Sequence, residues 1–391
     1  MKVQAARLLI TAALALAAAL SACSLQPAEP PRFSVGDAAG RPLPAALERL
    51  VDETGVRPAA PYAGVQPVER ELTGKLLSPE RQRIYAQVTS GFLQRSEVFA
   101  VRASVEEDLL AACEAVFADH PELFWIDSYS YAEYPEYMLI YPHFNLPVDQ
   151  IDAVQAQIGE RVEAIVAGAP LTGSTYDRVR YLYEQVVNNT AYELGSANNQ
   201  NIQSVFVNGV SVCGGYSRAF QYLCQRLDIP CAYILGETEE VGTHAWNLVE
   251  IDGVSSHVDT TWGDLIFSDG SGGRMSYDYL CVTGEEIGRD HWATSPAADA
   301  LPACDDQTYD YYRLNGCYLD VFDAVYLQGI ISSAVAMGDG SFAFKLGSAE
   351  DYAAALDYIA SGAVLEGDLA YVGPCSYVGN DTLWTIEVWW A

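Results

Sequence analysis

The spacing of apolar and polar residues changes several times along the chain and predicts its secondary structure. Apolar residues at helical spacing predict helices over residues 79–94 and 104–118. Aromatic residues that alternate with polar ones predict two strands, over 124–131 and 137–141. Together these elements indicate a mixed α/β region over residues 63–173.

The middle of the chain carries stronger local signals. Ser174-Thr-Tyr-Asp177 matches the capping-box pattern and predicts the start of a helix. After a polar, turn-rich stretch over 188–201, a second helix is predicted to begin at Cys213 and to stop at Asp228-Ile-Pro230. A strand is predicted next, over 231–235. The second helix carries an apolar stripe made of Tyr216, Ala219, Phe220, Leu223 and Leu227.

A hairpin is predicted after this strand, and its turn determines which side chains face one another. Asp252-Gly253 between two alternating runs is a strong signal for a two-residue loop. With that loop Trp246 lies opposite Asp259, and His244 lies diagonally across from Asp259 on the same face, within roughly 7 Å. A three-residue loop would change this pairing, whereas a four-residue loop about the same centre would not. We expect the helix that begins at Cys213 to pack against this face.

The end of the chain is predicted to form a small α+β appendage over residues 306–391. Its pattern predicts a strand over 342–346, a helix over 349–360 and a last strand over 382–390. With the mixed N-terminal region and a central core over 174–305, the sequence predicts an α+β protein of three regions.

The first residues are predicted to be an export signal rather than part of the fold. The basic residues Lys2 and Arg7 lie at the start of the chain, and a continuous apolar run from Leu8 to Leu20 follows them. That run has 13 residues, fewer than the roughly 20 of a membrane-spanning helix, as in a signal peptide. Leu20-Ser-Ala-Cys23 resembles the bacterial lipobox, which implies cleavage before Cys23 and acylation of its thiol. The alternative is an ordinary secretory signal with an incidental cysteine.

The expected location and the charge of the chain limit the kinds of partner that it is expected to bind. Residues 1–22 would be removed, and 23–62, rich in Pro, Ala and Gly, would tether the protein to a membrane, with a short helix over 43–52. The formal net charge, 21 − 52 = −31, repels phosphate backbones and argues against a nucleic-acid partner. We therefore expect an exported protein that is lipid-anchored on the extracytoplasmic face of a cell membrane.

The cysteines give no sign of a metal or of a disulfide scaffold. An exported chain meets an oxidising environment, in which disulfides are permitted. Apart from Cys23 and Cys213, the cysteines show no C-x-x-C and no dense spacing. Most are interpreted as small buried hydrophobic residues, and a Cys304–Cys317 bridge is left open. We expect neither a metal nor a cofactor.

Cys213, His244 and Asp259 occur in the order that a nucleophilic site needs. A thiol attacks as a thiolate, and the partial positive charge of a helix N-terminus stabilises that anion. Cysteines so placed beside a histidine have pKa values between roughly 3.5 and 7.5. Gly214 and Gly215 are expected to leave the thiol uncrowded, and the N–H groups there would stabilise an oxyanion. The carboxylate would hold the imidazole in one tautomer.

These residues lie in motifs that resemble the transglutaminase-like superfamily. The matching segments are Val212-Cys-Gly-Gly-Tyr-Ser-Arg-Ala-Phe220, His244-Ala-Trp-Asn247 and His257-Val-Asp-Thr-Thr-Trp262, within a resemblance that covers about 174–295. The resemblance implies a papain-like core, in which the cysteine helix packs on an antiparallel sheet. It also implies Cys213 as nucleophile, His244 as general base and acid, and Asp259 as its orienting partner. The order of segments is similar to bacterial lipoproteins of this group.

Several nearby residues have two interpretations. Ser255-Ser256 stands where related sequences often carry aromatic residues, so a substrate or packing contact differs here. His257 shares the face of the site, but a hydrogen-bonded strand histidine is favoured over a second base. Trp246 either walls the cleft or packs against its neighbours. His291 is interpreted as a loop anchor. Gln203 is a candidate oxyanion donor that no spacing demands.

The chemistry expected from this arrangement is acyl transfer. The sequence predicts a cysteine peptidase or amidase that cleaves peptide amide bonds through a thioester, and hydrolysis is favoured over transamidation because water is the default acceptor. Cell-surface peptides and peptidoglycan stem peptides are the substrates that the location would offer. The alternatives are a catalytically inactive binding module of the same fold and a structural envelope protein.

Overall fold

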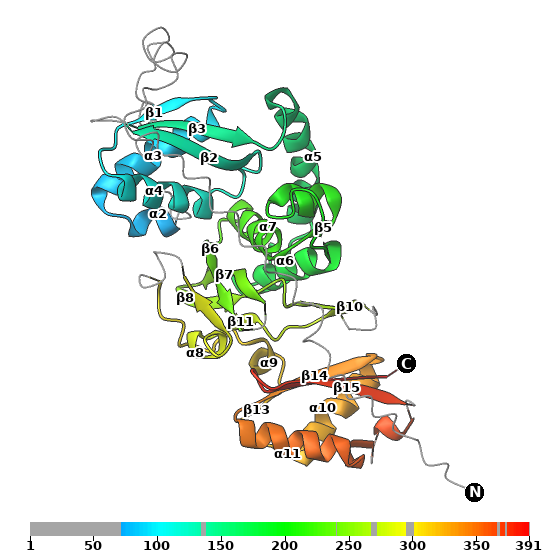
Figure 1. Cartoon of the computed structure of the whole chain (residues 1–391). Helices are drawn as coiled ribbons and strands as arrows, with labels where there is room; N and C mark the ends of the chain where they lie inside the picture. Colours follow the sequence, from blue (N-terminus) through cyan, green and yellow to red (C-terminus); the bar gives the residue numbers. More distant parts are fainter. Residues whose placement is uncertain are drawn as a thin grey trace, which may run out of the picture.

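The computed structural model of the chain describes residues 72–133, 138–239, 241–266, 272–294, 301–365, 368–371 and 374–390. The predicted signal peptide, Cys23 and the tether with its short helix lie outside these residues. Figure 1 shows three parts that follow one another in the order of the sequence, coloured blue to cyan, green to yellow, and orange to red. None of the helices in the described ranges is long and apolar enough to cross a membrane.

The first part combines three helices and a three-stranded sheet with a long fourth helix. Its elements are α2 (Leu72–Leu76), α3 (Pro79–Leu93), β1 (Phe99–Val101), α4 (Glu106–Asp119), β2 (Ile126–Glu133), β3 (Met138–Phe144) and α5 (Val148–Ala167). The strand order is β1-β3-β2, with antiparallel pairs. The predicted helices over 79–94 and 104–118 are confirmed, and both predicted strands exist, shifted by one to three residues. Helix α5 was not predicted.

The second part is built around α7 and a five-stranded antiparallel sheet. Its elements are α6 (Thr175–Asn189), β4 (Ala191–Tyr192), the π-helical turn η1 (Ser204–Asn208), β5 (Val210–Ser211), α7 (Cys213–Arg226), β6 (Cys231–Thr238), β7 (Gly242–Ile251), β8 (Val254–Val258), β9 (Asp264–Ile266), β10 (Gly272–Met275), β11 (Leu280–Val282), α8 (Gly284–Ile287) and β12 (His291–Ala293). The strand order is β11-β8-β7-β6-β12. The capping box of Ser174 and Asp177 is confirmed at the start of α6.

The predicted hairpin has the predicted register. Ile251 faces Val254 and Asn247 faces Val258, as a two-residue loop requires. Asp252 and Gly253 have φ values of 51° and 86°, and a type I′ turn needs positive φ at both central residues. The local turn therefore determines the pairing of β7 with β8.

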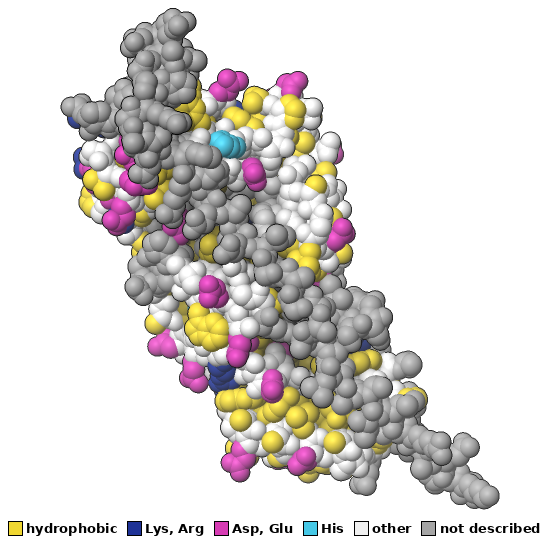
Figure 2. Space-filling model, in the orientation of Figure 1, with side chains coloured by type: hydrophobic (Ala, Val, Ile, Leu, Met, Phe, Trp, Pro, Cys, Tyr) yellow, Lys and Arg dark blue, Asp and Glu magenta, His cyan; other side chains and the backbone are white. Residues whose placement is uncertain are grey.

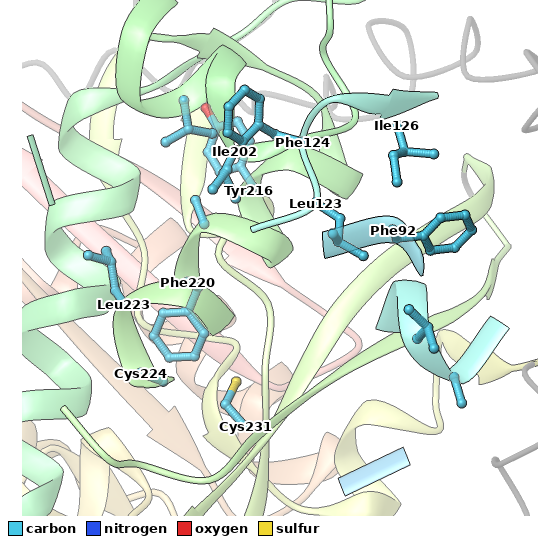
Figure 3. Packing of buried hydrophobic residues seen from close by; sticks show 14 of the residues in the cluster. Phe92, Leu123, Phe124, Ile126, Ile202, Tyr216, Phe220, Leu223, Cys224 and Cys231 are labelled. Carbon is cyan, nitrogen blue, oxygen red and sulfur yellow. The ribbon is translucent and has the colours of Figure 1, made fainter. Parts of the chain in front are cut away.

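One hydrophobic core joins the first two parts. It extends from Ile84 to Cys281 and includes both faces of the contact between α4 and α7. Figure 3 shows this cluster, to which the first part contributes Phe92, Leu123, Phe124 and Ile126 and the second part contributes Ile202, Tyr216, Phe220, Leu223, Cys224 and Cys231. The buried stripe predicted for α7 thus packs against the N-terminal part of the molecule as well as against its own sheet.

Polar contacts hold α7 in place beside α4. The last carbonyl groups of α4 have no partner within their own helix. Gln221 donates to the carbonyl oxygen of Ala118 at 2.7 Å, and Gln225 donates to that of Asp119 at 2.9 Å. Arg218 donates to the carbonyl oxygen of Phe117. Side chains from successive turns of α7 therefore satisfy the end of α4, which fixes the helix that carries Cys213.

The third part has a hydrophobic core of its own. Its elements are α9 (Tyr311–Leu314), β13 (Tyr318–Leu319), α10 (Ala324–Met337), β14 (Ser341–Leu346), α11 (Ala349–Ala360), the 3-10 turns η3 (Ala363–Leu365) and η4 (Asp368–Tyr371), β15 (Cys375–Asn380) and β16 (Thr385–Trp390). The sheet order is β13-β14-β16-β15. The predicted strand over 342–346, the helix over 349–360 and the last strand are confirmed, whereas α10 and β15 were not predicted.

Candidate active site

Cys213 is the first residue of α7, as predicted, and its side chain is 7% exposed. Its two glycine neighbours make close contacts. Gly214 and Gly215 are buried, and a Cβ at these positions would collide with Gln200 Oε1 and with Ser211 Oγ, respectively. The expectation that they leave the thiol uncrowded stays a prediction. They allow the segment before α7 to pack directly against the helix start.

Helix α7 runs beside β7, so that its first turn lies near the strand end that carries His244. Ser217 Oγ donates to the carbonyl oxygen of Ala245 at 2.8 Å. One turn later, Gln221 Nε2 donates to the carbonyl oxygen of Cys231 at 3.3 Å, in the strand that pairs with β7. Cys213 precedes Ser217 by four residues, about 6 Å along the helix. The thiol is thereby placed toward the start of β7.

The helix covers the face of the sheet opposite to the expected one. Asn247 Nδ2 donates to the carbonyl oxygen of Ser217, so Asn247 points toward α7. Successive side chains of a strand alternate between faces, and His244 therefore lies on the other face, stacked on Trp246. The prediction that α7 packs against the face of His244 is wrong. The first turn of α7, which contains Cys213, lies toward the end of β7 that carries His244.

His244 and Asp259 are brought together as predicted. His244 Nε2 lies 2.7 Å from Asp259 Oδ2, and both side chains are buried. The other carboxylate oxygen, Oδ1, accepts from the backbone N–H groups of Thr261 at 2.7 Å and of Trp262 at 3.3 Å. Because Asp259 engages Nε2, the ring atom that remains to exchange a proton with a thiol is Nδ1.

The charge state of Asp259 follows from its partners. Burial raises the pKa of this carboxyl, but the charges and hydrogen bonds of His244 and His291 outweigh burial. The resulting pKa lies well below the ordinary value of an aspartic acid. Asp259 is therefore ionised at neutral pH and favours the protonated form of His291.

His291 is a member of this cluster, and its interpretation as a loop anchor is wrong. It begins β12, which pairs with β6 at the sheet edge, and its Nε2 lies 3.3 Å from Asp259 Oδ2. Its Nδ1 contacts Asp290 Oδ1. Burial lowers the pKa of His291, but the hydrogen bonds to the two carboxylates raise it above the ordinary value. A buried chain of polar groups thus runs from Asp290 through His291 and Asp259 to His244.

The other two aromatic residues on this face have structural roles. Trp246 is 1% exposed, so it does not wall a cleft, and its indole N–H donates to His257 Nδ1 at 3.1 Å. This hydrogen bond confirms His257 as a satisfied strand histidine. Burial lowers the pKa of His257 to about 4, with a further contribution from the charge of His291. His257 is therefore neutral at pH 7 and accepts a hydrogen bond through the nitrogen that a base would use.

Two glutamines near the start of α7 differ in their position. Gln203 lies in the segment before η1, and its Oε1 is buried without a hydrogen-bond partner among the residues that the structure describes. Gln200 was not singled out in the sequence, yet its amide lies directly against Gly214, in the first turn of α7. It is an amide beside the helix start, and the polar stretch over 188–201 gave no signal that would have distinguished it. Ser256 is buried, so its difference from related sequences affects packing.

Three buried ligand atoms also have the spacing of a metal site. His244, Asp259 and His291 each offer one atom, and these atoms lie within 4.8 Å of one another. Two imidazoles and one carboxylate would suit a divalent transition metal. The hydrogen bonds of 2.7 and 3.3 Å between the same atoms account for this geometry without an ion.

Among the other described cysteines, Cys113, Cys224, Cys231, Cys281, Cys304 and Cys317 are free thiols. Cys304 and Cys317 form no disulfide, and Cys304 is buried while Cys317 is half-buried. Burial raises the pKa of both thiols, that of Cys304 to about 11.

Comparisons with known proteins agree with this geometry. Residues 163–262 match the family model of the transglutaminase-like superfamily. This segment contains Cys213, His244 and Asp259. The central part of the chain is transglutaminase-like. No curated protein sequence matches the chain.

Solved structures similar to this chain share little sequence with it. A transglutaminase is 15% identical, with a TM-score of 0.27 over 46% of this chain and 54% of the other. Menin, solved with its binding site for the MLL protein, is 18% identical, with a TM-score of 0.25 over 49% and 43%. The periplasmic domain of TgpA from Pseudomonas aeruginosa, bound to ethylmercury, is 16% identical, with a TM-score of 0.21 over 32% and 55%. The chain thus spans about half the length of these proteins.

Proposed function

We propose that this protein is a cysteine-dependent acyl-transfer enzyme that hydrolyses peptide amide bonds through a thioester. The observation that carries the proposal is the hydrogen bond of 2.7 Å between His244 Nε2 and Asp259 Oδ2, at the strand end beside the first turn of α7. An ionised carboxylate there holds the imidazole so that Nδ1 is available to a nucleophile. Cys213 is the nucleophile that the fold supplies.

The proposed reaction has two halves. His244 Nδ1 takes the proton of Cys213, and the thiolate sulfur attacks the carbonyl carbon of the amide to give a tetrahedral oxyanion. N–H groups at the start of α7 stabilise this oxyanion. The C–N bond then breaks as His244 returns its proton to the leaving amine, which leaves a thioester on Cys213. Water, deprotonated by His244, attacks the thioester and releases the acid and the thiol.

His291 supports this cycle from the far side of Asp259. In its protonated state it places a positive charge between Asp259 and Asp290, both of which it contacts. That charge helps to keep Asp259 ionised throughout the cycle, so that the carboxylate continues to orient His244. His291 is therefore proposed as a positioning residue rather than a catalytic one.

The proposed setting is the extracytoplasmic face of a membrane. The basic start, the short apolar run and the lipobox-like Leu20-Ser-Ala-Cys23 support export and acylation of Cys23. Peptides of the cell surface or cell wall would then be the accessible substrates. Radiolabelled palmitate incorporation into the expressed chain, with Cys23→Ala as its control, tests this setting; equal labelling of the two chains would contradict it.

The chemistry is tested by the reactivity of the thiol. At pH 6.5 we expect iodoacetamide to modify Cys213 at least about tenfold faster than a free model thiol such as N-acetylcysteine. Cys317 of the same chain, whose pKa burial raises, should react more slowly than either. A peptide library digested by the wild type and read by mass should yield products that Cys213→Ala does not form. Modification of Cys213 no faster than that of the model thiol, together with no product in the digest, would leave a binding module of this fold as the better explanation.

A further inference from the structure

A large cavity lies between the transglutaminase-like core and the C-terminal part. Its volume is about 1430 Å³, more than the roughly 300–1,000 Å³ of a typical small-molecule pocket. One wall comes from the core, including Trp262, Asp264 and Tyr277, and the other comes from α10 and the C-terminal sheet, including Tyr326 and Ile330. Neither Cys213 nor His244 is among the described lining residues.

The lining is acidic to an unusual degree. The described lining residues include eight carboxylates and no Lys, Arg or His. Asp290 contacts His291, and Glu387 forms an ion pair with Arg274. In the described part of the chain, the other six form no ion pair: Glu193, Glu239, Asp264, Asp278, Asp339 and Asp381. Figure 2 shows that acidic side chains outnumber basic ones over the visible face as well.

The inner carboxylates of the cavity are held by neutral donors instead of cations. Asp264 Oδ2 accepts from the hydroxyl of Tyr216 at 2.7 Å, and burial raises the pKa of Asp264. Asp278 accepts from Tyr312, Asn380 and Thr385, at 2.5, 3.1 and 2.7 Å. Carboxylates removed from water are stabilised most by an opposite charge, so a cation that enters this cavity would be favoured.

Aromatic and apolar surfaces accompany the carboxylates. Tyr277 and Tyr311 are stacked with their ring centroids 3.9 Å apart, and Tyr326 and Met337 of α10 are exposed. Faces of aromatic rings attract ammonium and guanidinium groups, and the methylene stems of lysine and arginine pack on apolar surfaces. The hydroxyl of Thr261, which is buried and lines the cavity, has no hydrogen-bond partner in the described structure. A guest with polar backbone groups could supply one.

Trp262 connects the cavity with the candidate active site. It is half-buried and lines the cavity. Its ring centroid lies 5.7 Å from that of His244 and 4.6 Å from that of His291. A peptide bound against Trp262 would therefore be separated from His244, the proposed catalytic histidine, by the Trp262 ring.

We infer that this cavity binds a lysine- or arginine-bearing segment of the peptide substrate, next to the amide that is cleaved. That the bound segment belongs to the substrate rests on the proposed function. That the cavity binds a cationic peptide rests on the lining of the cavity alone. The size of the cavity and its apolar wall favour a peptide over a single metal ion, which would use only a few of the carboxylates.

Binding is tested without turnover in the Cys213→Ala protein. The probes are three fluorescein-labelled octapeptides in which alanine alternates with lysine, glutamine or glutamate, and the readout is fluorescence anisotropy. We expect the lysine peptide to bind at least about tenfold more tightly than the glutamine peptide at low salt, with a smaller difference at high salt. The glutamate peptide should bind most weakly.

A matched pair of variants separates the cavity from bulk charge. In the Cys213→Ala background, the triple variant Glu193→Gln, Glu239→Gln and Asp264→Asn should weaken the lysine peptide by about tenfold. A control triple variant on exposed carboxylates of β2 and α5, Asp127→Asn, Glu133→Gln and Glu160→Gln, removes the same charge and should change the affinity by less than about twofold. Equal losses in the two triple variants would overturn the inference.

The inference and the proposed function fail in different experiments. If Cys213 is reactive but the lysine and glutamine peptides bind equally, the cavity proposal falls and the catalytic proposal stands. If the lysine peptide binds selectively but Cys213 is no more reactive than the model thiol, the catalytic proposal falls and the cavity remains a binding site for cationic peptides.

Discussion

Two buried clusters of this protein place one positively charged group between two carboxylates. In the core, His291 lies between Asp259 and Asp290. At the junction with the C-terminal part, Lys345 Nζ lies 2.5 Å from Glu286 and 2.9 Å from Asp310. The arrangement of charges is the same, but the two clusters are suited to different tasks.

The difference lies in the pKa of the central group and in its neighbours. Burial lowers the pKa of Lys345, but the two carboxylates raise it above its ordinary value, so the ammonium group keeps its proton at physiological pH. Lys345 of β14 therefore fastens the C-terminal part to α8 of the core. An imidazole exchanges its proton near neutral pH, and the His291 cluster ends at a second imidazole, His244. The same arrangement of charges thus makes either a permanent ion-pair link or the cluster that we propose to transfer protons.

The largest expected effect separates the clusters by activity. His244→Ala should lower peptide hydrolysis by roughly 10⁴-fold, because it removes the proposed acceptor and donor of the Cys213 proton. Lys345→Met should retain at least about half of the activity at a temperature where it stays folded. Both are measured as product formed from the library-derived peptide. Loss of activity in Lys345→Met as large as that in His244→Ala would mean that the two clusters do not divide their roles.

The second prediction concerns stability, and here Lys345→Met is the variant with the large effect. Lys345→Met leaves Glu286 and Asp310 buried without their cation, which should lower the free energy of unfolding by about 3–5 kcal/mol. The exposed Lys75→Met serves as the control and should change it by less than about 0.5 kcal/mol. Urea unfolding followed by circular dichroism measures both. A change below 1 kcal/mol in Lys345→Met would show that water or a rearranged side chain replaces the ammonium group.

A third effect distinguishes the clusters by pH. The pKa of His291 is raised in the folded state, so its stabilising contribution is complete below the unfolded pKa of about 6.5 and is lost as the pH rises through the folded pKa. The stability lost in His291→Asn should therefore decrease between pH 6 and pH 8.5. The loss in Lys345→Met should stay constant over this window, because Lys345 remains charged. Parallel pH profiles for the two variants would contradict this division.

The lowered pKa of Asp259 does not alter the pH dependence of stability that is expected for His291→Asn. A depressed carboxyl pKa contributes stability that is present above the unfolded value of about 3.9 and is lost only as the pH falls further. Its contribution is therefore constant between pH 6 and pH 8.5.

The smallest effect concerns the histidine that shares the face of the site without joining the chain of charges. His257→Asn should change hydrolysis by less than about twofold, since His257 contacts Trp246 and not Asp259. The free energy of unfolding should fall by about 1 kcal/mol for the altered hydrogen bond. A loss of activity approaching that of His244→Ala would assign His257 a role that its low pKa argues against.

Local patterns predicted those elements whose partners are near in the sequence. The capping box of Ser174 and Asp177 marked the start of α6, and the turn at Asp252 and Gly253 set the register of β7 and β8. That register was enough to place His244 beside Asp259. Helix α5, which was not predicted, has a recognisable apolar spacing, whereas α10 is apolar almost throughout and shows no clear helical period.

Such local patterns did not predict the contacts between segments that are distant in the sequence. Nothing near His291 indicates that β12 pairs with β6 instead of forming a loop, and this pairing brings His291 to Asp259. The face of the sheet that α7 covers depended on the shared core with α4, which no local spacing encodes. The role of Gly214 and Gly215 likewise depended on Gln200 and Ser211, which pack on them.

The sequence by itself determined the order of Cys213, His244 and Asp259, and the turn that brings the last two together, because the hydrogen bonds of a hairpin join residues that are close in the sequence. Only the tertiary structure decided that a second histidine joins the carboxylate and that an acidic cavity opens beside it. Those features arise where the core and the C-terminal part bury their apolar surfaces together. Which segments bury their apolar surfaces together depends on the shapes of surfaces from the whole chain, so no short stretch of residues specifies it.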